Sequence, residues 1–294
     1  MALHGLIIYN GFLQGNKFLD FAEMLQHAAV HRGHHIQLKT NDELINDLTG
    51  SHMFANKTNE LDYVIFTDKD IYLANTLERA RVPVFNNATS IEISDDKIKT
   101  YERLVDEHIP IPKTIVAPKT FGMNIHPEQP FLQHIIDSFQ YPFIMKEAFG
   151  SFGEQVYLVR NETDVHYYLK KINGAPFVFQ EYIEASYGVD LRLQVVGDRV
   201  VAAMKRSSES DFRANVTSGG TMESYVPTAY EAELAINATK AIGAHFAGVD
   251  ILLGDRGKRY VCEVNSNAHI RNLYECTNIN VAPDIIDHIE QQLT

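Results

Sequence analysis

The sequence predicts a mixed fold, in which a parallel α/β domain precedes a region of the α+β class. Strand and helix signals alternate along the first 94 residues, whereas hairpin signals and helix pairs dominate the rest of the chain. The length of 294 residues suggests about two domains, or one domain with clear subdomains. We therefore expect a domain at residues 1–94 and two further parts at 95–175 and 176–294.

The first part alternates apolar strand runs with helical patterns. Apolar residues recur at helical spacing over Phe18–Ala29, and Gly33 stands where a C-terminal cap belongs. The pattern Thr40-x-x-Glu43 is typical of a capping box and predicts a short helix. Strands joined through helices imply a parallel sheet with right-handed crossovers. The other expected elements are the strands at 6–9, His35–Thr40, Tyr63–Thr67 and 82–85 and the helix Asp68–Arg81.

The middle part combines a helix pair with a hairpin. Ser94 is expected to cap a helix that runs to about Glu107, where the proline-containing segment 109–112 ends it. Asn161 is expected to start a helix that Gly174 ends. The other expected elements are the strands Thr114–Ala117, Phe143–Glu147 and Gln155–Val159 and the helix Pro130–Phe139.

The last part is richest in hairpin signals. Gly197-Asp198 is a favourable two-residue turn, and the segment 254–257 predicts a second turn. Thr228-x-x-Glu231 predicts the start of a long helix. The expected strands are Phe177–Ile183, Leu191–Val196, Arg199–Met204, Val249–Leu253 and Arg259–Asn265, followed by a final helix at Ala282–Leu293.

Composition excludes several classes of protein. The net charge of −12 argues against nucleic-acid or anionic-membrane partners, so a small anionic ligand needs local Lys and Arg or a metal ion. Cys262 and Cys276 have no C-x-x-C spacing, which argues against a disulfide scaffold or a cysteine zinc site and fits a reducing compartment. No apolar run approaches the length of a membrane span, and we expect a soluble cytoplasmic protein.

The last predicted hairpin carries polar residues on otherwise apolar strands. Glu263 and Asn265 share one strand face, while Cys262 and Val264 take the other. A turn centred on residues 255–256 would place Asp250 opposite Val261 and on the face of Glu263. These oxygen ligands suit Mg²⁺ shared with phosphate oxygens, and a solvated sheet face is the alternative.

Two further patterns indicate a phosphate and an adenine site. Lys146 ends an apolar strand and is followed by Gly150 and Gly153, an outline of a phosphate cradle, with a plain hairpin loop as the alternative. The strand Phe177–Ile183 turns polar only at Gln180-Glu181 and could offer adenine its backbone within an apolar slot. An edge strand is the alternative there.

Lys205, Arg206 and Arg213 lie within nine residues and indicate an anion site in an acidic chain, with solvated charges as the alternative. The turn at Gly197-Asp198 would place Asp190 opposite Lys205.

The order of these features resembles the ATP-grasp superfamily, and within it the RimK-like carboxylate–amine (alpha-L-glutamate) ligases, which add glutamate to a protein or small-molecule carboxylate. The resemblance is dense over residues 90–294, loose before them, and reaches Lys97. It implies an N-terminal pre-ATP-grasp domain and a two-subdomain ATP-grasp fold. It rests on Lys146 with its glycine loop, Gln180–Ile183, Asp190, Arg206, Asp211–Asn215, Ala247–Ile251 and Glu263–Asn265.

The resemblance also implies a role for each matched residue. Those expected to contact the nucleotide are Lys97, Lys146, Gly150, Ser151, Gly153, Gln180, Glu181, Tyr182, Ile183, Asp190, Lys205, Arg213 and Asn215. Among them the two lysines at 97 and 146 would hold ATP phosphates, the glycine loop would act as a lid, Glu181 and Tyr182 would line the adenine slot, and Asp190 would meet the ribose. Arg206, Lys146 and Arg213 are the expected catalytic residues, with Arg206 stabilising charge during attack on the γ-phosphate. Asp250, Glu263 and Asn265 would bind two Mg²⁺, with Mn²⁺ as an alternative.

The function implied is an ATP-dependent ligase that joins a small-molecule carboxylate to an amino-acid amine through an acyl phosphate, with a protein or peptide C-terminus as an alternative acceptor. A catalytically idle ATP-binding regulator and a phosphotransferase are the competing functions. The chain departs from the family at 266–271, where relatives carry small residues and a Pro-Gly turn. Asn267, His269 and Arg271 are therefore candidate substrate residues: Arg271 for a carboxylate and His269 for the amine, with structural roles as the alternative.

Overall fold

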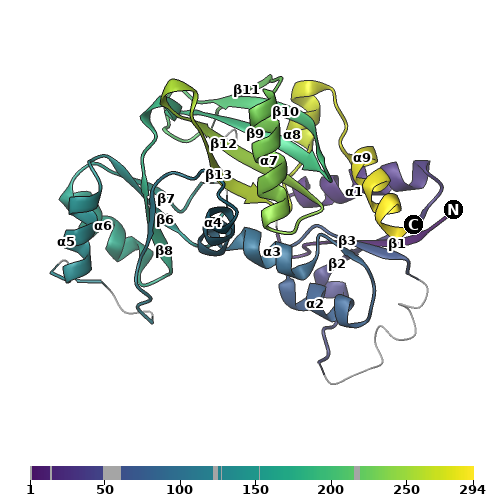
Figure 1. Ribbon diagram of the computed structural model, residues 1–294. Helices are drawn as coiled ribbons and strands as arrows, with labels where there is room; N and C mark the ends of the chain where they lie inside the picture. Colours follow the sequence, from purple (N-terminus) through teal and green to yellow (C-terminus); the bar gives the residue numbers. More distant parts are fainter. Residues whose placement is uncertain are drawn as a thin grey trace.

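The computed structural model describes residues 2–13, 15–48, 61–121, 125–126, 128–151, 153–214 and 219–294. These residues form three sheets, which Figure 1 shows as separate layers joined by helices. Within these residues, no helix has the length and apolar character needed to cross a membrane.

The N-terminal sheet is parallel, as predicted, with the order β2-β1-β3-β4. Its strands are β1 (His4–Tyr9), β2 (His35–Thr40), β3 (Tyr63–Phe66) and β4 (Val84–Phe85). One face packs against α1 (Lys17–His31) and the C-terminal helix α9 (Ala282–Leu293), and the other against α2 (Ile71–Arg79) and α3 (Ala88–Asp95). The expected capping box of Thr40 and Glu43 is present, but it opens only the single 3₁₀ turn η1 (Asn41–Glu43).

The second sheet is antiparallel and has the order β5-β8-β6-β7. It consists of β5 (Thr114–Val116), β6 (Phe143–Glu147), β7 (Val156–Val159) and β8 (Phe177–Glu181), and it packs against α5 (Pro130–Ser138) and α6 (Glu162–Ile172). Because β8 lies between β5 and β6, the edge-strand interpretation of this segment is wrong. This pairing also carries the sheet past residue 175, where we expected a boundary.

The third sheet is antiparallel and has the order β11-β10-β9-β12-β13. One face packs against α4 (Lys97–Asp106) and α7 (Ala229–Ala241), and α8 (Arg271–Thr277) contacts β10 and β11. The strands are β9 (Val189–Val196), β10 (Arg199–Ser207), β11 (Thr221–Ser224), β12 (Phe246–Leu253) and β13 (Arg259–Asn265), with 3₁₀ turns η3 (Glu184–Ser186) and η5 (Asp255–Gly257). The sequence did not predict β11 or α8.

The predicted helix from Ser94 to Glu107 is two helices. Asp96 is the N-cap of α4 and accepts a hydrogen bond from the Ile98 backbone N–H at 2.9 Å. Ser94 instead lies in the last turn of α3, where its hydroxyl donates to the Ile91 carbonyl at 3.1 Å. The break places Lys97 at the first position of α4.

The two ends of the chain meet in one core. Ile285, Ile286 and Ile289 of α9 are fully buried against α1 and the first sheet. Figure 1 shows α9 (yellow) beside α1 (purple), with both termini at this end of the molecule. The C-terminal helix therefore joins the last part of the chain to the first.

Candidate active site

A cavity of about 790 Å³ is lined by residues of the second and third sheets and by residues that follow two strands of the first sheet. Its walls come from the end of β3, the start of α4, the strand β6 and the strand β13, which provide Asp68, Lys97, Lys146 and Glu263. The sequence-predicted residues that line it are Lys97, Lys146, Gly150, Ser151, Gly153, Gln180, Glu181, Tyr182, Ile183, Asp190, Arg206, Arg213, Asp250, Glu263, Asn265, Asn267 and His269. Asn215 lies outside the described residues.

The two carboxylates of the β12–β13 hairpin lie directly opposite each other. Asp250 pairs with Glu263, and the register shifts between Asp250 and Ile251, so the expected pairing of Asp250 with Val261 is wrong. The shift leaves Cys262 as the extra residue on β13. As a result Cys262 and Glu263 both line the cavity, although strict alternation would place them on opposite faces.

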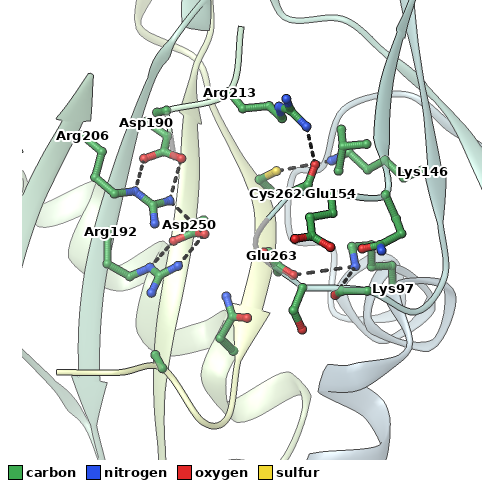
Figure 2. Close-up of a pocket in the computed structure, with 18 of the residues that line it drawn as sticks. Lys97, Lys146, Glu154, Asp190, Arg192, Arg206, Arg213, Asp250, Cys262 and Glu263 are labelled. Carbon is green, nitrogen blue, oxygen red and sulfur yellow. Dashed lines mark hydrogen bonds and ion pairs between the residues drawn. The ribbon is translucent and has the colours of Figure 1, made fainter. Parts of the chain in front are cut away.

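Asp250 is held in a row of alternating charges with Arg192, Arg206 and Asp190, which Figure 2 shows. The four residues belong to β9, β10 and β12. Arg206 donates two hydrogen bonds to Asp190, at 2.7 and 2.6 Å, and approaches Asp250 at 3.0 Å. Arg192 forms a bidentate pair with the other side of Asp250, with its Nη2 at 2.8 Å from Oδ2.

The partner of Asp190 across the strands is Arg206 and not Lys205, because a bulge between Val200 and Ala202 shifts the pairing by one residue. Lys205 therefore points to the other face, where its Nζ pairs with Glu223 at 2.8 Å. Among the described lining residues Lys205 is absent, so its expected nucleotide contact has no geometric support.

The guanidinium groups set the charge of this row. Burial opposes the ionised form of Asp250, but Arg192 and Arg206 hold the pKa of that carboxyl below its usual value. Burial likewise disfavours the charged form of Arg206, and Asp250 and Asp190 more than offset it, so the pKa of Arg206 lies above its usual value. Burial raises the pKa of Asp190 despite its pairing with Arg206.

Lys146 reaches the cavity from β6 and is buried. Its Nζ lies 3.4 Å from both the Tyr101 hydroxyl and the Cys262 sulfur. Burial disfavours the ammonium, but Cys262, Tyr101 and Glu263 more than offset this, and the pKa of Lys146 lies above its usual value. Burial also raises the pKa of the Cys262 thiol.

The glycine loop is held from two sides. The Nζ of Lys97 lies 3.2 Å from the Gly150 carbonyl and 3.8 Å from a Glu263 oxygen, so it stands between the loop and the carboxylates. Arg213 donates to the Gly153 carbonyl from the opposite side, and Asp211 holds its guanidinium. The positive φ of Gly150, 146°, is a conformation that other residues rarely adopt.

The segment after β13 contributes to the cavity and to a contact between helices. Asn267 and His269 line the cavity, and the His269 ring packs edge-on against Phe18 at 4.9 Å. Arg271 instead pairs with Asp20 of α1 and is absent from the described lining residues. Arg271 therefore joins α8 to α1, which is the structural role given as the alternative to binding a substrate carboxylate.

Two important lining residues escaped the sequence prediction. Arg192 lies two positions after Asp190 on β9, so strand alternation could have placed it on the same face. Asp68 follows β3, and the carboxyl ends of parallel strands are a common place for ligand sites. Its position shortly after a strand of a parallel sheet is the sequence feature that could have identified Asp68.

Comparison with known proteins identifies the family. A family model described as the RimK-like ATP-grasp domain matches residues 94–289. "Probable alpha-L-glutamate ligase 1" of Shewanella sp. (strain W3-18-1) is 36% identical over 219 residues, which cover 74% of this chain and 70% of the relative. "Uncharacterized protein MG012 homolog" of Mycoplasma pneumoniae is 32% identical over 224 residues, which cover 74% of this chain and 77% of the relative.

Solved structures share the fold at low sequence identity. A RimK domain ATP-grasp protein from Sphaerobacter thermophilus has a TM-score of 0.73 at 19% identity, covering 96% of this chain and 98% of that one. The ATP-grasp ligase PsnB complexed with a minimal precursor has a TM-score of 0.72 at 16% identity, covering 99% and 100%. With two thirds of its length matched by the family model, the chain belongs to the RimK-like ATP-grasp family of ATP-dependent ligases.

Proposed function

We propose that this ligase joins a carboxylate to the amine of an amino acid through an acyl phosphate, with release of ADP and phosphate. One observation carries the proposal: Lys97, Lys146 and Arg206 enter the same cavity as the facing carboxylates Asp250 and Glu263. Phosphoryl transfer needs little covalent chemistry from the protein and depends on positioning and on neutralisation of charge. This arrangement supplies both.

We propose Mg²⁺ and ATP as the cofactors of this cavity. Among the described residues no three His, Cys, Asp or Glu side chains cluster closely enough to hold a metal unaided. The two carboxylates and the Asn265 side-chain oxygen nevertheless supply the oxygen ligands that suit Mg²⁺ when phosphate oxygens complete its shell. Two ions held by Asp250, Glu263 and Asn265 remain our proposal. When bound, the metal would neutralise phosphate charge.

The protein groups divide the remaining tasks. Lys97 and Lys146 would fix the phosphates, and the loop between them and Arg213 would cover the reacting atoms and exclude water. Arg206 would stabilise negative charge as the carboxylate attacks. The adenine slot is assigned to Gln180, Glu181, Tyr182 and Ile183, and the ribose to Asp190, on their place in the cavity wall.

The substrates are inferred from the family. Relatives named as glutamate ligases favour an amino acid as the amine, and PsnB, which is described in complex with its precursor peptide, makes a peptide carboxylate an alternative to a small molecule. The cytoplasm is the proposed location, because Cys262 and Cys276 are both free thiols.

Glu263→Ala tests the assignment. With ATP, Mg²⁺ and a panel of amino acids and carboxylates, the intact chain should release ADP only when an acceptor is present, and mass spectrometry should find an amide. Glu263→Ala should abolish this release without unfolding the protein. Glu233→Ala, an exposed glutamate on α7, is the matched control and should retain it. Unchanged turnover in Glu263→Ala would contradict the metal assignment, and a phosphorylated product would identify a phosphotransferase.

A further inference from the structure

The cavity continues past the proposed nucleotide residues to a wall built by the N-terminal sheet. Asn10 follows β1 and Asp68 follows β3, and both line this wall. Asn267 and His269, in the segment after β13, line the same cavity. The N-terminal part thus contributes side chains to the cavity, and the proposed roles of the nucleotide and metal residues do not use them.

Asp68 is a buried carboxylate, and one of its oxygens has no hydrogen-bond partner among the described residues. Its side chain is only 5% exposed, and its Oδ1 accepts a hydrogen bond from the Asn10 amide at 2.9 Å. Its Oδ2 is buried with no hydrogen-bond partner, and Asp68 forms no ion pair within the part of the chain that the structure describes. A buried ionised group without a partner costs free energy, so this oxygen is suited to a ligand that brings a donor and a positive charge.

Asn267 adds a second acceptor beside it. Its Nδ2 donates to the Asp68 carbonyl at 2.7 Å, which fixes the amide orientation. Its Oδ1 is buried and has no partner. The side-chain amide therefore presents an oxygen that a ligand N–H can reach.

His269 adds a third acceptor. Its Nδ1 is buried and has no partner, whereas the ring forms a hydrogen bond with the backbone of Lys17. Burial, together with Lys17 and Arg192, lowers the pKa of His269 to about 4. The ring is neutral at pH 7, and a hydrogen bond from Nε2 to the Lys17 carbonyl would leave Nδ1 with a lone pair.

The acceptor atoms and the carboxylate of this cavity wall suit one chemical group. An ammonium group has three N–H donors and one positive charge, whereas a carboxylate would be repelled by Asp68. Mg²⁺ would need about six ligands in octahedral geometry, more than this wall offers.

We infer that Asp68, Asn267 and His269 bind the ammonium group of a primary amine. Identifying that amine as the second substrate of the ligase rests on the proposed function. Asn267 lies two residues after Asn265, so an amine bound here would lie close to the proposed metal and phosphate site.

Thermal unfolding in the presence of saturating ADP and Mg²⁺ tests the inference. The probes are the common amino acids, each at the same millimolar concentration, and their N-acetylated forms. At least one free amino acid should raise the unfolding temperature, and its N-acetylated form should not, because acetylation removes the positive charge. Asp68→Asn should lose this amine-dependent shift while keeping the shift caused by ADP and Mg²⁺.

Asp106→Asn is the matched control, since it removes the same charge from an exposed position on α4. It should retain both shifts. Any of three results would overturn the assignment. These are an unfolding temperature that does not change with any amine, one that changes equally with the acetylated form or with potassium chloride, and a change that is undiminished in Asp68→Asn. The acetylated probe decides the question in the unmutated protein even if Asp68→Asn fails to fold. A normal amine shift without acceptor-dependent ADP release would leave the amine site in place and reject the ligase proposal.

Discussion

The row Asp190–Arg206–Asp250–Arg192 shows how single residues fix the geometry of this cavity. Each of the four side chains is at most 15% exposed, so each charge has lost most of its contact with water. Two carboxylates and two guanidinium groups balance one another. Charges buried in this way are tolerated only as a complete set, since loss of one member leaves another unpaired.

Arg206→Met should therefore destabilise the protein as well as reduce activity. It removes the positive charge between Asp190 and Asp250, and the expected loss of unfolding free energy is about 3–5 kcal/mol. Urea denaturation followed by circular dichroism measures this loss.

The double variant Asp190→Asn with Arg206→Met is the control. It also removes the charge that the single variant leaves unpaired, while Arg192 still balances Asp250, so it should be clearly more stable than Arg206→Met. A single variant as stable as the unmodified chain would contradict this account.

The residue scale also shows where sequence reasoning was least accurate. A shift of one residue in strand register exchanges the two faces of a strand. Because of the bulge between Val200 and Ala202, Arg206 and not Lys205 pairs with Asp190. Because of the register shift after Asp250, Glu263 pairs with Asp250. Alternation along a strand cannot reveal such bulges, because they depend on pairing with the neighbouring strand.

At the scale of helices and strands, local patterns were more informative. The capping box of Thr228 and Glu231 starts α7, and both predicted hairpins are present. The missed elements, β11 and α8, are short and contact the neighbouring strand β10. Such segments owe their structure to tertiary contacts more than to intrinsic propensity, so their own sequence carries little signal.

The contact between β12 and α9 should make stability depend on pH. The Nδ1 of His245, next to the start of β12, lies 3.0 Å from Nε2 of His288. Burial is the main cause that lowers the pKa of both rings, that of His245 to about 4. When the pH falls below the ordinary histidine pKa of about 6.5, the His245 ring binds a proton in the unfolded chain but not in the folded protein. The free energy of unfolding should therefore be highest above pH 6.5 and decrease towards pH 4, by at most about 3 kcal/mol for His245.

Urea denaturation at several pH values measures this dependence. His245→Gln removes the titrating ring, so its unfolding free energy should fall less between pH 6.5 and 4. His31→Gln, at an exposed position on α1, should keep the original slope. An identical pH profile for His245→Gln would show that the histidine pair does not contribute.

At the scale of the whole molecule, the sequence predicted the parallel or antiparallel type of the sheets better than the contacts between distant segments. The alternating pattern correctly gave a parallel first sheet, and the hairpins gave antiparallel sheets after it. It did not predict that β8 joins β5 and β6, or that α9 packs against α1. Both contacts join segments far apart in the sequence, and amphipathic periodicity identifies a buried face without identifying its partner.

The same limit applies to the cavity. Patterns within single segments predicted Lys146, Asp250 and Glu263, and the family resemblance supplied others of the lining residues, such as Lys97 and Asp190. The N-terminal wall with Asp68 emerges only when the three sheets are assembled. The assembled molecule therefore has two kinds of wall: one rich in cations and carboxylates, and one with buried acceptor atoms that have no partner among the described residues.

The central claim is that this cavity activates a carboxylate as an acyl phosphate, and oxygen transfer tests it most directly. In that reaction a carboxylate oxygen attacks the γ-phosphorus, and the carbon–oxygen bond breaks when the amine forms the amide, so that oxygen leaves with phosphate. With a carboxylate labelled with oxygen-18 and its amine partner, the phosphate should carry one labelled oxygen when analysed by mass spectrometry. Unlabelled phosphate released together with the amide would contradict the account.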